Sequence, residues 1–345
     1  MSHVSPASSP RVSVVLPAWN AAATLSVALE SLAAQTLADF EVLVVDDGSV
    51  DATPEVVRAH SRRDPRFRLL SPGRVGLARA LNLGLAQARA AYVARMDADD
   101  RCLPARLARQ AAFLDAHPDV GLVSCQVVFD GDRIQSGGYA RHVDWVNSLL
   151  EPEAIALNRF RESPLAHPSV LFRAGLVTAY GGYADGLFPE DYELWLRWLE
   201  RGVVMAKLAE PLLEWRDDPA RLSRTDQRYA VEAFHAVKAP YLARWLARHN
   251  PHHPDVLLIG AGRVTRKRAD LLLAQGVRCR AYVDIDPRKV GKTVHGRPVW
   301  HREALPEPGE CFAVSFLAGH DAGEDLQAFL EGRGWVLGRD FILAG

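Results

Sequence analysis

The chain has 345 residues, of which 48% are hydrophobic and 24% are charged, and this length indicates about two globular domains rather than one. Lysine and arginine number 41 against 42 for aspartate and glutamate, so the formal net charge is −1. A protein that wraps a nucleic-acid backbone needs an excess of cationic side chains. We therefore expect no nucleic-acid partner. The ordinary balance of hydrophobic and charged residues excludes collagen-like, coiled-coil and globally disordered classes.

Cysteine spacing and hydropathy favour a reduced, aqueous compartment. Cys102, Cys125, Cys279 and Cys311 lie far apart and form no CxxC or Cys/His pattern of a zinc site or a disulfide framework. No apolar run reaches the roughly 18 residues that span a bilayer, and the Ser/Pro-rich residues 1–10 lack the apolar stretch of a signal peptide. We expect a disordered lead over residues 1–10 and a cytoplasmic protein, with contact at the inner face of the membrane left open.

The N-terminal third alternates strand and helix patterns. Continuous β-branched runs predict buried strands at residues 12–16 and 41–45, and apolar spacing predicts helices at 21–35 and 51–62. The pattern continues with a strand at 67–70, a helix at 77–90, a strand at 92–96, a helix at 104–116 and a strand at 120–129. This alternation is typical of an α/β sheet with right-handed crossovers.

A second domain is expected after residue 249. The stretch up to about residue 162 is irregular, and helices follow at 191–201 and 227–249 before a Pro/His-rich break at 250–255. Beyond it, a strand at 256–259, the turn Gly260–Gly262, a helix at 266–275 and a strand at 280–283 form a small Rossmann-like unit. We therefore divide the chain into a domain at 11–249, a linker at 250–255 and an accessory domain at 256–345.

Two acidic clusters follow predicted strands. Asp46 and Asp47 come after the second strand, and Asp97, Asp99 and Asp100 come after the strand at residues 92–96. Because ligands of open α/β sheets gather at the carboxyl ends of strands, we expect both clusters at one edge of the sheet. Alternating carboxylates there suit a hard divalent cation and the phosphates of a nucleotide, although each cluster by itself could equally be a helix-capping turn.

Five motifs in order resemble those of family 2 glycosyltransferases with a GT-A fold, and the resemblance covers about residues 11–240. They are 14–20 (VVLPAWN), 44–49 (VVDDGS), 78–82 (ARALN), 97–100 (DADD) and 189–197 (PEDYELWLR). The resemblance implies a nucleotide-diphosphosugar donor, UDP-linked by expectation, together with Mn²⁺ or Mg²⁺. It implies metal ligands at Asp97 and Asp99, and donor-binding residues at Pro17, Ala18, Asn20, Asp46, Asp47, Arg79 and Asp97; for Arg79 a solvated helix face is the other interpretation.

By the same resemblance Asp191 is the general base that takes the proton of the acceptor hydroxyl, although an acid in a first helical turn can also merely stabilise the helix dipole. Some relatives carry a metal-reaching histidine after this helix, but here the segment is without one. We expect Arg221 or Arg224 to neutralise the leaving diphosphate instead, and Arg224 joins the donor-binding set. The QxxRW motif of processive synthases is also missing, which favours transfer of one sugar per encounter.

The expected activity is thus an inverting, hexosyl-type transfer to a saccharide or lipid-linked acceptor in cell-surface polysaccharide or glycolipid biosynthesis. Two alternatives remain. The first is an NAD(P)-dependent oxidoreductase that works through Gly260, Gly262 and Asp284, although the third glycine of the dinucleotide motif is missing. The second is a catalytically silent sugar-nucleotide sensor. The sequence leaves a homo-oligomer open.

Overall fold

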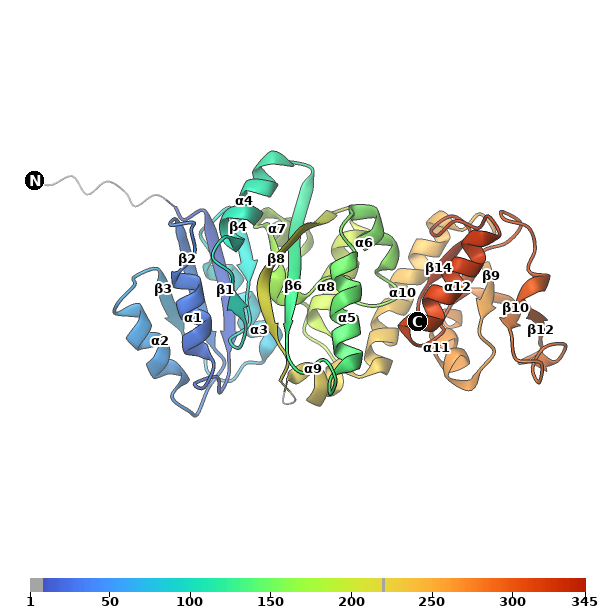
Figure 1. Ribbon diagram of the computed structural model, residues 1–345, viewed down its shortest axis with the longest axis horizontal. Coiled ribbons are helices and arrows are strands. Elements are labelled where there is room, and N and C mark those ends of the chain that lie inside the picture. The colour runs from blue at the N-terminus through green and yellow to red at the C-terminus, as the bar shows by residue number, and fades with distance from the viewer. Residues whose placement is uncertain (1–8, 219–220) are drawn as a thin grey trace, which may run out of the picture. The chain divides into compact units, whose positions relative to one another are not determined.

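The computed structural model describes residues 9–218 and 221–345 and resolves two compact units (Figure 1). Of the described residues, the first unit contains 9–155, 164–186, 201–218 and 221, and the second contains 156–163, 187–200 and 222–345. The predicted disordered lead falls, for residues 1–8, outside the described residues. In the described part of the chain no helix has the length and apolarity needed to cross a bilayer.

The first unit is built on a mixed eight-stranded sheet with the strand order β3-β2-β1-β4-β7-β6-β8-β5. Strands β1 to β4 run parallel, whereas β7 runs antiparallel to both β4 and β6. The strands are β1 (Val12–Ala18), β2 (Phe40–Asp46), β3 (Phe67–Leu70), β4 (Tyr92–Arg95), β5 (Arg101–Cys102), β6 (Val120–Asp130), β7 (Leu171–Arg173) and β8 (Val204–Arg216).

Helices cover this sheet through apolar faces that the sequence already displays. Leu25, Leu29 and Leu32 of α1 are fully buried and pack in one core with Val14 and Val42 of the central strands. The helices that begin in this part of the chain are α1 (Leu25–Ala33), α2 (Thr53–Ser61), α3 (Leu77–Gln87), α4 (Arg106–Ala116), α5 (Gly137–Ser148), α6 (Pro152–Asn158) and α7 (Gly175–Tyr180), and residues His167–Ser169 form a 3₁₀ turn. The predicted α/β architecture is confirmed.

Two parts of the sequence-based assignment are wrong. The stretch expected to be irregular up to residue 162 contains helices α5 and α6, and no strand was predicted at β8. Strand β8 pairs with β6 from Val120 and Val204 to Asp130 and Arg216, with three shifts of register. Its apolar pattern is interrupted by Lys207, Glu210 and Pro211, so period-two alternation is weak and long-range pairing determines the strand.

The second unit carries a six-stranded sheet with the order β11-β12-β10-β9-β13-β14. The strands are β9 (Asp255–Ile259), β10 (Arg278–Asp284), β11 (Thr293–Val294), β12 (Arg297–His301), β13 (Ala313–Ser315) and β14 (Phe341–Leu343). The helices are α8 (Glu190–Glu200), α9 (Leu222–Thr225), α10 (Val231–His249), α11 (Arg263–Leu273) and α12 (His320–Gly332), with 3₁₀ turns at Gln227–Tyr229 and Arg302–Ala304. A second sheet-containing domain is therefore present.

The second unit includes a helix that lies far from its sheet in the sequence. Tyr192 and Leu196 of α8 share one buried core with Leu242 and Leu246 of α10 and with Val256 of β9. The predicted linker at residues 250–255 lies inside this unit rather than at its border. Whether residues 256–345 fold independently stays a prediction.

Candidate active site

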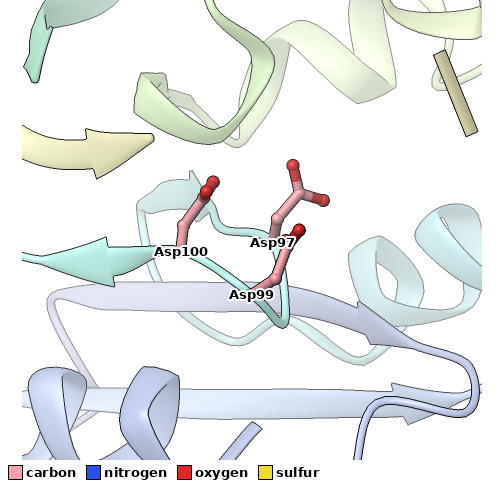
Figure 2. Close-up of side chains that lie close together, drawn as sticks. All are labelled: Asp97, Asp99 and Asp100. Carbon is pink, nitrogen blue, oxygen red and sulfur yellow. The ribbon is translucent and has the colours of Figure 1, made fainter. Parts of the chain in front are cut away.

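Three carboxylates meet in the loop that joins β4 to β5. Carboxyl oxygens of Asp97, Asp99 and Asp100 lie within 4.8 Å of one another, and the three side chains point to the same side of the loop (Figure 2). The loop starts at the carboxyl end of β4, where the Met96 amide donates to the Val15 carbonyl at 3.2 Å. The sheet edge thus gathers the acidic residues that the sequence places in succession.

Burial and mutual repulsion make this cluster electrostatically unfavourable by itself. Burial, and next the charge of Asp97, raise the pKa of Asp99. Burial, followed by Asp97 and Asp99, raises the pKa of Asp100 well above its ordinary value. The Asp100 Oδ1 accepts from the Arg216 amide at 3.0 Å, but its buried Oδ2 accepts no hydrogen bond from any described residue. A divalent cation, which prefers carboxylate oxygens, fits this donor set.

The motif resemblance names Asp97 and Asp99 as metal ligands and gives Asp100 no role, whereas the structure makes Asp100 a third candidate ligand. Asp100 is only 1% exposed, and a buried carboxylate is unfavourable unless it is paired or bound to a cation. The run of acids at residues 97–100 (DADD) could have indicated a third ligand, but the turn of the loop determines which of these carboxylates converge.

Two arginines belong to the surroundings of the triad. The Arg95 Nη1 lies 2.5 Å from the Asp97 Oδ1, and Arg95 is buried. Arg221 donates from Nη1 to the Tyr139 hydroxyl at 2.9 Å and to the Arg216 carbonyl at 2.8 Å. Burial lowers the pKa of Arg221, but Tyr139 and the three carboxylates outweigh this effect and raise it. Arg221 is therefore electrostatically coupled to the acidic triad.

Arg221 is also held by aromatic rings. Its guanidinium carbon lies 5.0 Å from the centre of the Trp215 ring and 5.5 Å from that of Tyr139. Of the two arginines that the sequence offered for the diphosphate, Arg221 lies in the unit that contains the triad, whereas Arg224 lies on α9 in the second unit. The structure thus distinguishes two candidates that the sequence could not.

The acids at the end of β2 hold the neighbouring loops. Asp47 is 4% exposed and accepts from the amides of Val75 at 2.6 Å and Gly76 at 2.9 Å, and from Arg74 at 2.7 Å. These bonds fix the loop that leads into α3. Asp46 is also buried, and its Oδ1 accepts from the Ser49 amide at 3.1 Å. Both carboxylates therefore shape this part of the sheet edge.

The end of β1 is joined to the same loops. Pro17 and Ala18 close the strand, and the Ala18 carbonyl accepts from the Asp47 amide at 2.8 Å. Asn20 has a φ of 49°, and its Oδ1 accepts from the Val50 amide at 2.9 Å. An asparagine tolerates this left-handed conformation better than most side chains do. Trp19, which the sequence interpretation did not single out, is 47% exposed here.

Arg79 lies on α3 and pairs with Asp185. Its Nε donates to the Asp185 carboxylate at 2.8 Å, and the side chains are 68% and 55% exposed. The neighbouring Asn82 also joins α3 to this segment. Its Nδ2 donates to the Tyr183 carbonyl at 2.8 Å, and its Oδ1 accepts from the Tyr183 amide at 2.9 Å. Arg79 is thus accessible from solvent within the first unit.

In the second unit Asp191 lies in the first turn of α8. Its Oδ1 accepts from the Tyr192 amide at 2.7 Å, and Asp191 is more accessible to solvent than its neighbours Glu190 and Tyr192. Glu190 accepts from the Tyr229 hydroxyl at 2.7 Å, and the Tyr192 hydroxyl donates to the Arg159 carbonyl at 2.6 Å. Buried neighbours therefore fix the helix start.

The family model "Glycosyl transferase family 2" matches residues 13–178. The amylovoran biosynthesis glycosyltransferase AmsE of Erwinia amylovora is 34% identical over 190 residues, which cover 54% of this chain and 68% of the relative. The chain belongs to glycosyl transferase family 2. This family 2 protein is therefore a glycosyltransferase enzyme, and the family resemblance predicted from its motifs is confirmed.

Other similar proteins agree with the family assignment. An Escherichia coli protein named UDP-Gal:alpha-D-GlcNAc-diphosphoundecaprenol beta-1,3-galactosyltransferase is 29% identical over 225 residues, covering 65% of this chain and 80% of the relative. The crystal structure of S. aureus TarS has a TM-score of 0.52 at 20% identity and covers 77% of this chain and 42% of TarS. The TarS likeness confirms the GT-A fold.

Proposed function

We propose that this family 2 enzyme transfers one sugar from a UDP-linked donor to a hydroxyl acceptor with inversion at the anomeric carbon. The observation that carries the proposal is the convergence of Asp97, Asp99 and Asp100 at the carboxyl end of β4, in electrostatic contact with Arg221. A diphosphate needs both a cation site and a fixed positive side chain, because charge builds on it as the glycosidic bond breaks. This arrangement offers both.

The cation would be Mn²⁺ or Mg²⁺, held by Asp97, Asp99 and Asp100. When bound, it supplies Lewis-acid stabilisation of the negative charge on the departing diphosphate. Arg221 adds a second positive charge beside the carboxylates, and its guanidinium can donate to two phosphate oxygens at once. Arg224 is a further candidate for this role.

The remaining donor contacts come from the ends of β1 and β2. Pro17, Ala18 and Asn20 provide backbone and amide groups for the base and ribose, and Arg79 is available to the diphosphate or the sugar. Trp19 is half-exposed, and its ring, which the Arg74 guanidinium carbon approaches to 3.9 Å from the ring centre, is available for contact with a base. Asp46 and Asp47 act here mainly by holding the loops in place, because their oxygens already accept backbone amides.

Asp191 acts as the general base. It takes the proton of the acceptor hydroxyl while the acceptor oxygen forms a bond to the anomeric carbon from the face opposite the leaving group. The bond between that carbon and the phosphate oxygen breaks, and the diphosphate keeps the electron pair. A carboxylate in the first turn of a helix is favoured in its ionised form by the helix dipole, which suits this role.

The names of two relatives support a proposal for the acceptor class. AmsE is named for amylovoran biosynthesis, and a relative from Escherichia coli is named for O-antigen biosynthesis. We therefore propose a saccharide or lipid-linked acceptor in cell-surface polysaccharide assembly at the inner face of the membrane.

The test is a screen of UDP-, GDP- and dTDP-sugars with Mn²⁺, with Mg²⁺ and with EDTA, read by release of the nucleoside diphosphate. We expect hydrolysis or transfer with a UDP-sugar and its loss with EDTA, and NMR of the product should show inverted anomeric configuration. Donor binding without turnover toward any lipid-linked or free saccharide would contradict the proposal and support a sensor. Retained configuration would exclude the inverting mechanism.

A further inference from the structure

Positive charge is concentrated in one segment of the second unit. Residues 263–297 contain ten lysines and arginines but only three aspartates and no glutamate, which leaves seven positive charges in excess. The whole chain, by contrast, has 41 basic against 42 acidic residues and a net charge of −1. A strong local excess of one sign raises the local concentration of ions of the opposite sign, so this segment favours an anionic partner.

The fold brings cations of this segment together beside α11. The Arg266 Nη1 lies 3.1 Å from the His295 Nε2, which joins α11 to the turn between β11 and β12. Burial raises the pKa of Tyr282, and the charges of Arg266 and Arg297 both oppose this rise, so the two guanidinium groups lie near the same ring. Lys292 comes directly before β11. We call the cations Arg263, Arg266, Lys292 and Arg297 the basic surface.

Most of the basic surface is not neutralised by acidic side chains. Arg263, Lys292 and Arg297 are exposed and form no ion pair with any residue that the structure describes. Two of the three aspartates of the segment are already paired with Lys289, at 3.0 and 3.6 Å. The third, Asp270, lies in the second half of α11. The basic surface therefore keeps an excess of positive charge.

Two exposed apolar side chains border the basic surface. Val264 follows Arg263 in the first turn of α11 and is 59% exposed, and Ile285 directly follows β10 and is 62% exposed. Strands β9 and β10, which precede them, are adjacent and parallel, so both side chains lie at the carboxyl edge of the sheet. Single exposed apolar residues are common, but apolar side chains next to cations are typical of surfaces that lie at a lipid headgroup layer.

We infer that the basic surface docks on the anionic surface of a lipid bilayer, with Val264 and Ile285 at the boundary between headgroups and acyl chains. The cations are attracted by the phosphates and the net negative charge of such a surface. A nucleic acid offers the same negative charge but no apolar phase for the two side chains, so the bilayer is favoured. The docking does not depend on the proposed transfer, but it would hold the enzyme where a lipid-linked acceptor lies.

The first measurement is co-sedimentation of the full chain with vesicles of phosphatidylcholine, with and without phosphatidylglycerol. EDTA is present and no nucleotide sugar is added, so failure of the proposed transfer cannot affect the result. We expect binding to the anionic vesicles, much weaker binding to the neutral ones, and a loss of binding at high salt, which screens exposed charges. Equal binding to both kinds of vesicle, or none to the anionic vesicles, would overturn the inference.

Charge variants test the position of the surface. Arg263→Gln and Lys292→Gln should each weaken binding to the anionic vesicles about fivefold, because each cation near such a surface contributes roughly this factor. Arg278→Gln is the matched control, since this exposed arginine begins β10 and lies at the opposite edge of the same sheet. It should bind like the wild type. An equal loss in all three variants would show that only the total charge matters and would overturn the inference.

Apolar variants separate a bilayer from a soluble polyanion. The double variant Val264→Ser and Ile285→Ser keeps every charge, and we expect it to lose several-fold in affinity for the anionic vesicles while its salt dependence stays the same. Val336→Ser is the control, because Val336 is also exposed but precedes β14 at the opposite edge of the sheet. Unchanged vesicle binding of the double variant would assign the basic surface to a soluble polyanion and overturn the inference.

Discussion

At the scale of single residues, the three carboxylates of the acidic triad repel one another, and one buried oxygen, the Asp100 Oδ2, accepts no hydrogen bond from any described residue. Asp97, Asp99 and Asp100 converge in the loop after β4, and burial with neighbouring charge raises the pKa of Asp99 and Asp100. Such a cluster is unfavourable without a cation and favourable with one. The triad therefore lowers the stability of the metal-free fold, and a bound cation would remove this cost.

We predict that Asp99→Asn loses metal-dependent donor binding by at least about tenfold while the fold survives. The amide keeps the shape but removes the charge and weakens the repulsion with Asp97, so the metal-free variant should melt no lower than the wild type. Calorimetry of UDP binding with Mn²⁺ and with EDTA measures the effect. Asp144→Asn, which affects an exposed acid paired with Arg133, is the matched control; unchanged Mn²⁺ dependence in Asp99→Asn would rule out this ligand.

Substitutions of Arg221 test whether its side chain binds the diphosphate of the donor. Arg221→Met should raise the donor KM and lower kcat, because the guanidinium that faces the triad is lost. Arg221→Lys keeps the charge but loses the planar guanidinium that can donate to two phosphate oxygens at once, so we expect only partial rescue. Steady-state kinetics with varied donor distinguish the three proteins. Equal kinetics in all of them would transfer the role to Arg224.

For Asp191 we predict a separation of binding from transfer. Asp191→Asn should keep donor affinity and lose about a hundredfold or more of the transfer rate, because the amide cannot accept the acceptor proton. Donor affinity is measured by calorimetry and transfer by product formation at saturating donor. Glu200→Gln, at the opposite end of α8 where Glu200 pairs with Arg244, is the control. A normal rate in Asp191→Asn would leave Asp191 as a helix-stabilising residue only.

At the scale of elements, helix α10 carries a buried lysine. Lys238 is 2% exposed and donates to the Phe160 carbonyl at 2.8 Å. Burial, and next the charge of Arg268, lower the pKa of Lys238 from 10.5 to about 7. The hydrogen bond ties α10 to the segment that follows α6, but the ammonium form is disfavoured there.

This lysine should make stability dependent on pH. Between about pH 7 and 10.5 the unfolded chain holds a proton on Lys238 that the folded chain has released, so stability rises with pH across this window, by at most about 1.4 kcal/mol per pH unit. Lys238→Met should flatten the rise, as measured by urea unfolding at several pH values. Lys207→Met should flatten the rise in a similar way, because burial lowers the pKa of Lys207 to about 7 as well. An unchanged slope in Lys238→Met would show that this lysine remains charged in the fold.

At the scale of the whole molecule, the two compact units divide the proposed roles. The triad and Arg221 lie in the first unit, whereas Asp191 lies on α8 in the second. Helix α8 packs in one core with α10 and the C-terminal sheet, through side chains such as Tyr192, Leu196 and Val256. The C-terminal sheet therefore supports the helix that carries the proposed base.

Ending the chain after Asn250 tests this division. We expect metal-dependent donor binding to persist, because the triad stays, and transfer to fall sharply, because Tyr192 and Leu196 lose the strands that bury them. Donor calorimetry and the transfer rate are measured on the truncated and the full chain. Full transfer by the truncated protein would show that residues 251–345 are an independent accessory domain, as the predicted linker suggests.

The sequence alone determined the elements whose signal is local. Buried β-branched runs fixed β1 and β2, and the predicted strand at residues 67–70 agrees with β3 residue for residue. Five ordered motifs were enough to identify the family, because each occurs at a strand end or a helix start where short-range chemistry defines it. The positions of Asp97 and Asp99 at one sheet edge also followed from the strand that precedes them.

Other features depend on contacts between segments that are distant in the sequence. Strand β8 exists because it pairs along β6, and its own sequence has too little alternation to show it. Asp100 becomes a ligand candidate through burial, and Arg221 is favoured over Arg224 because its guanidinium is held by Tyr139 and Arg216 beside the triad. Helix α8 joins the C-terminal sheet through a shared core. In each case the cause is burial and pairing across long sequence separations, which no local pattern records.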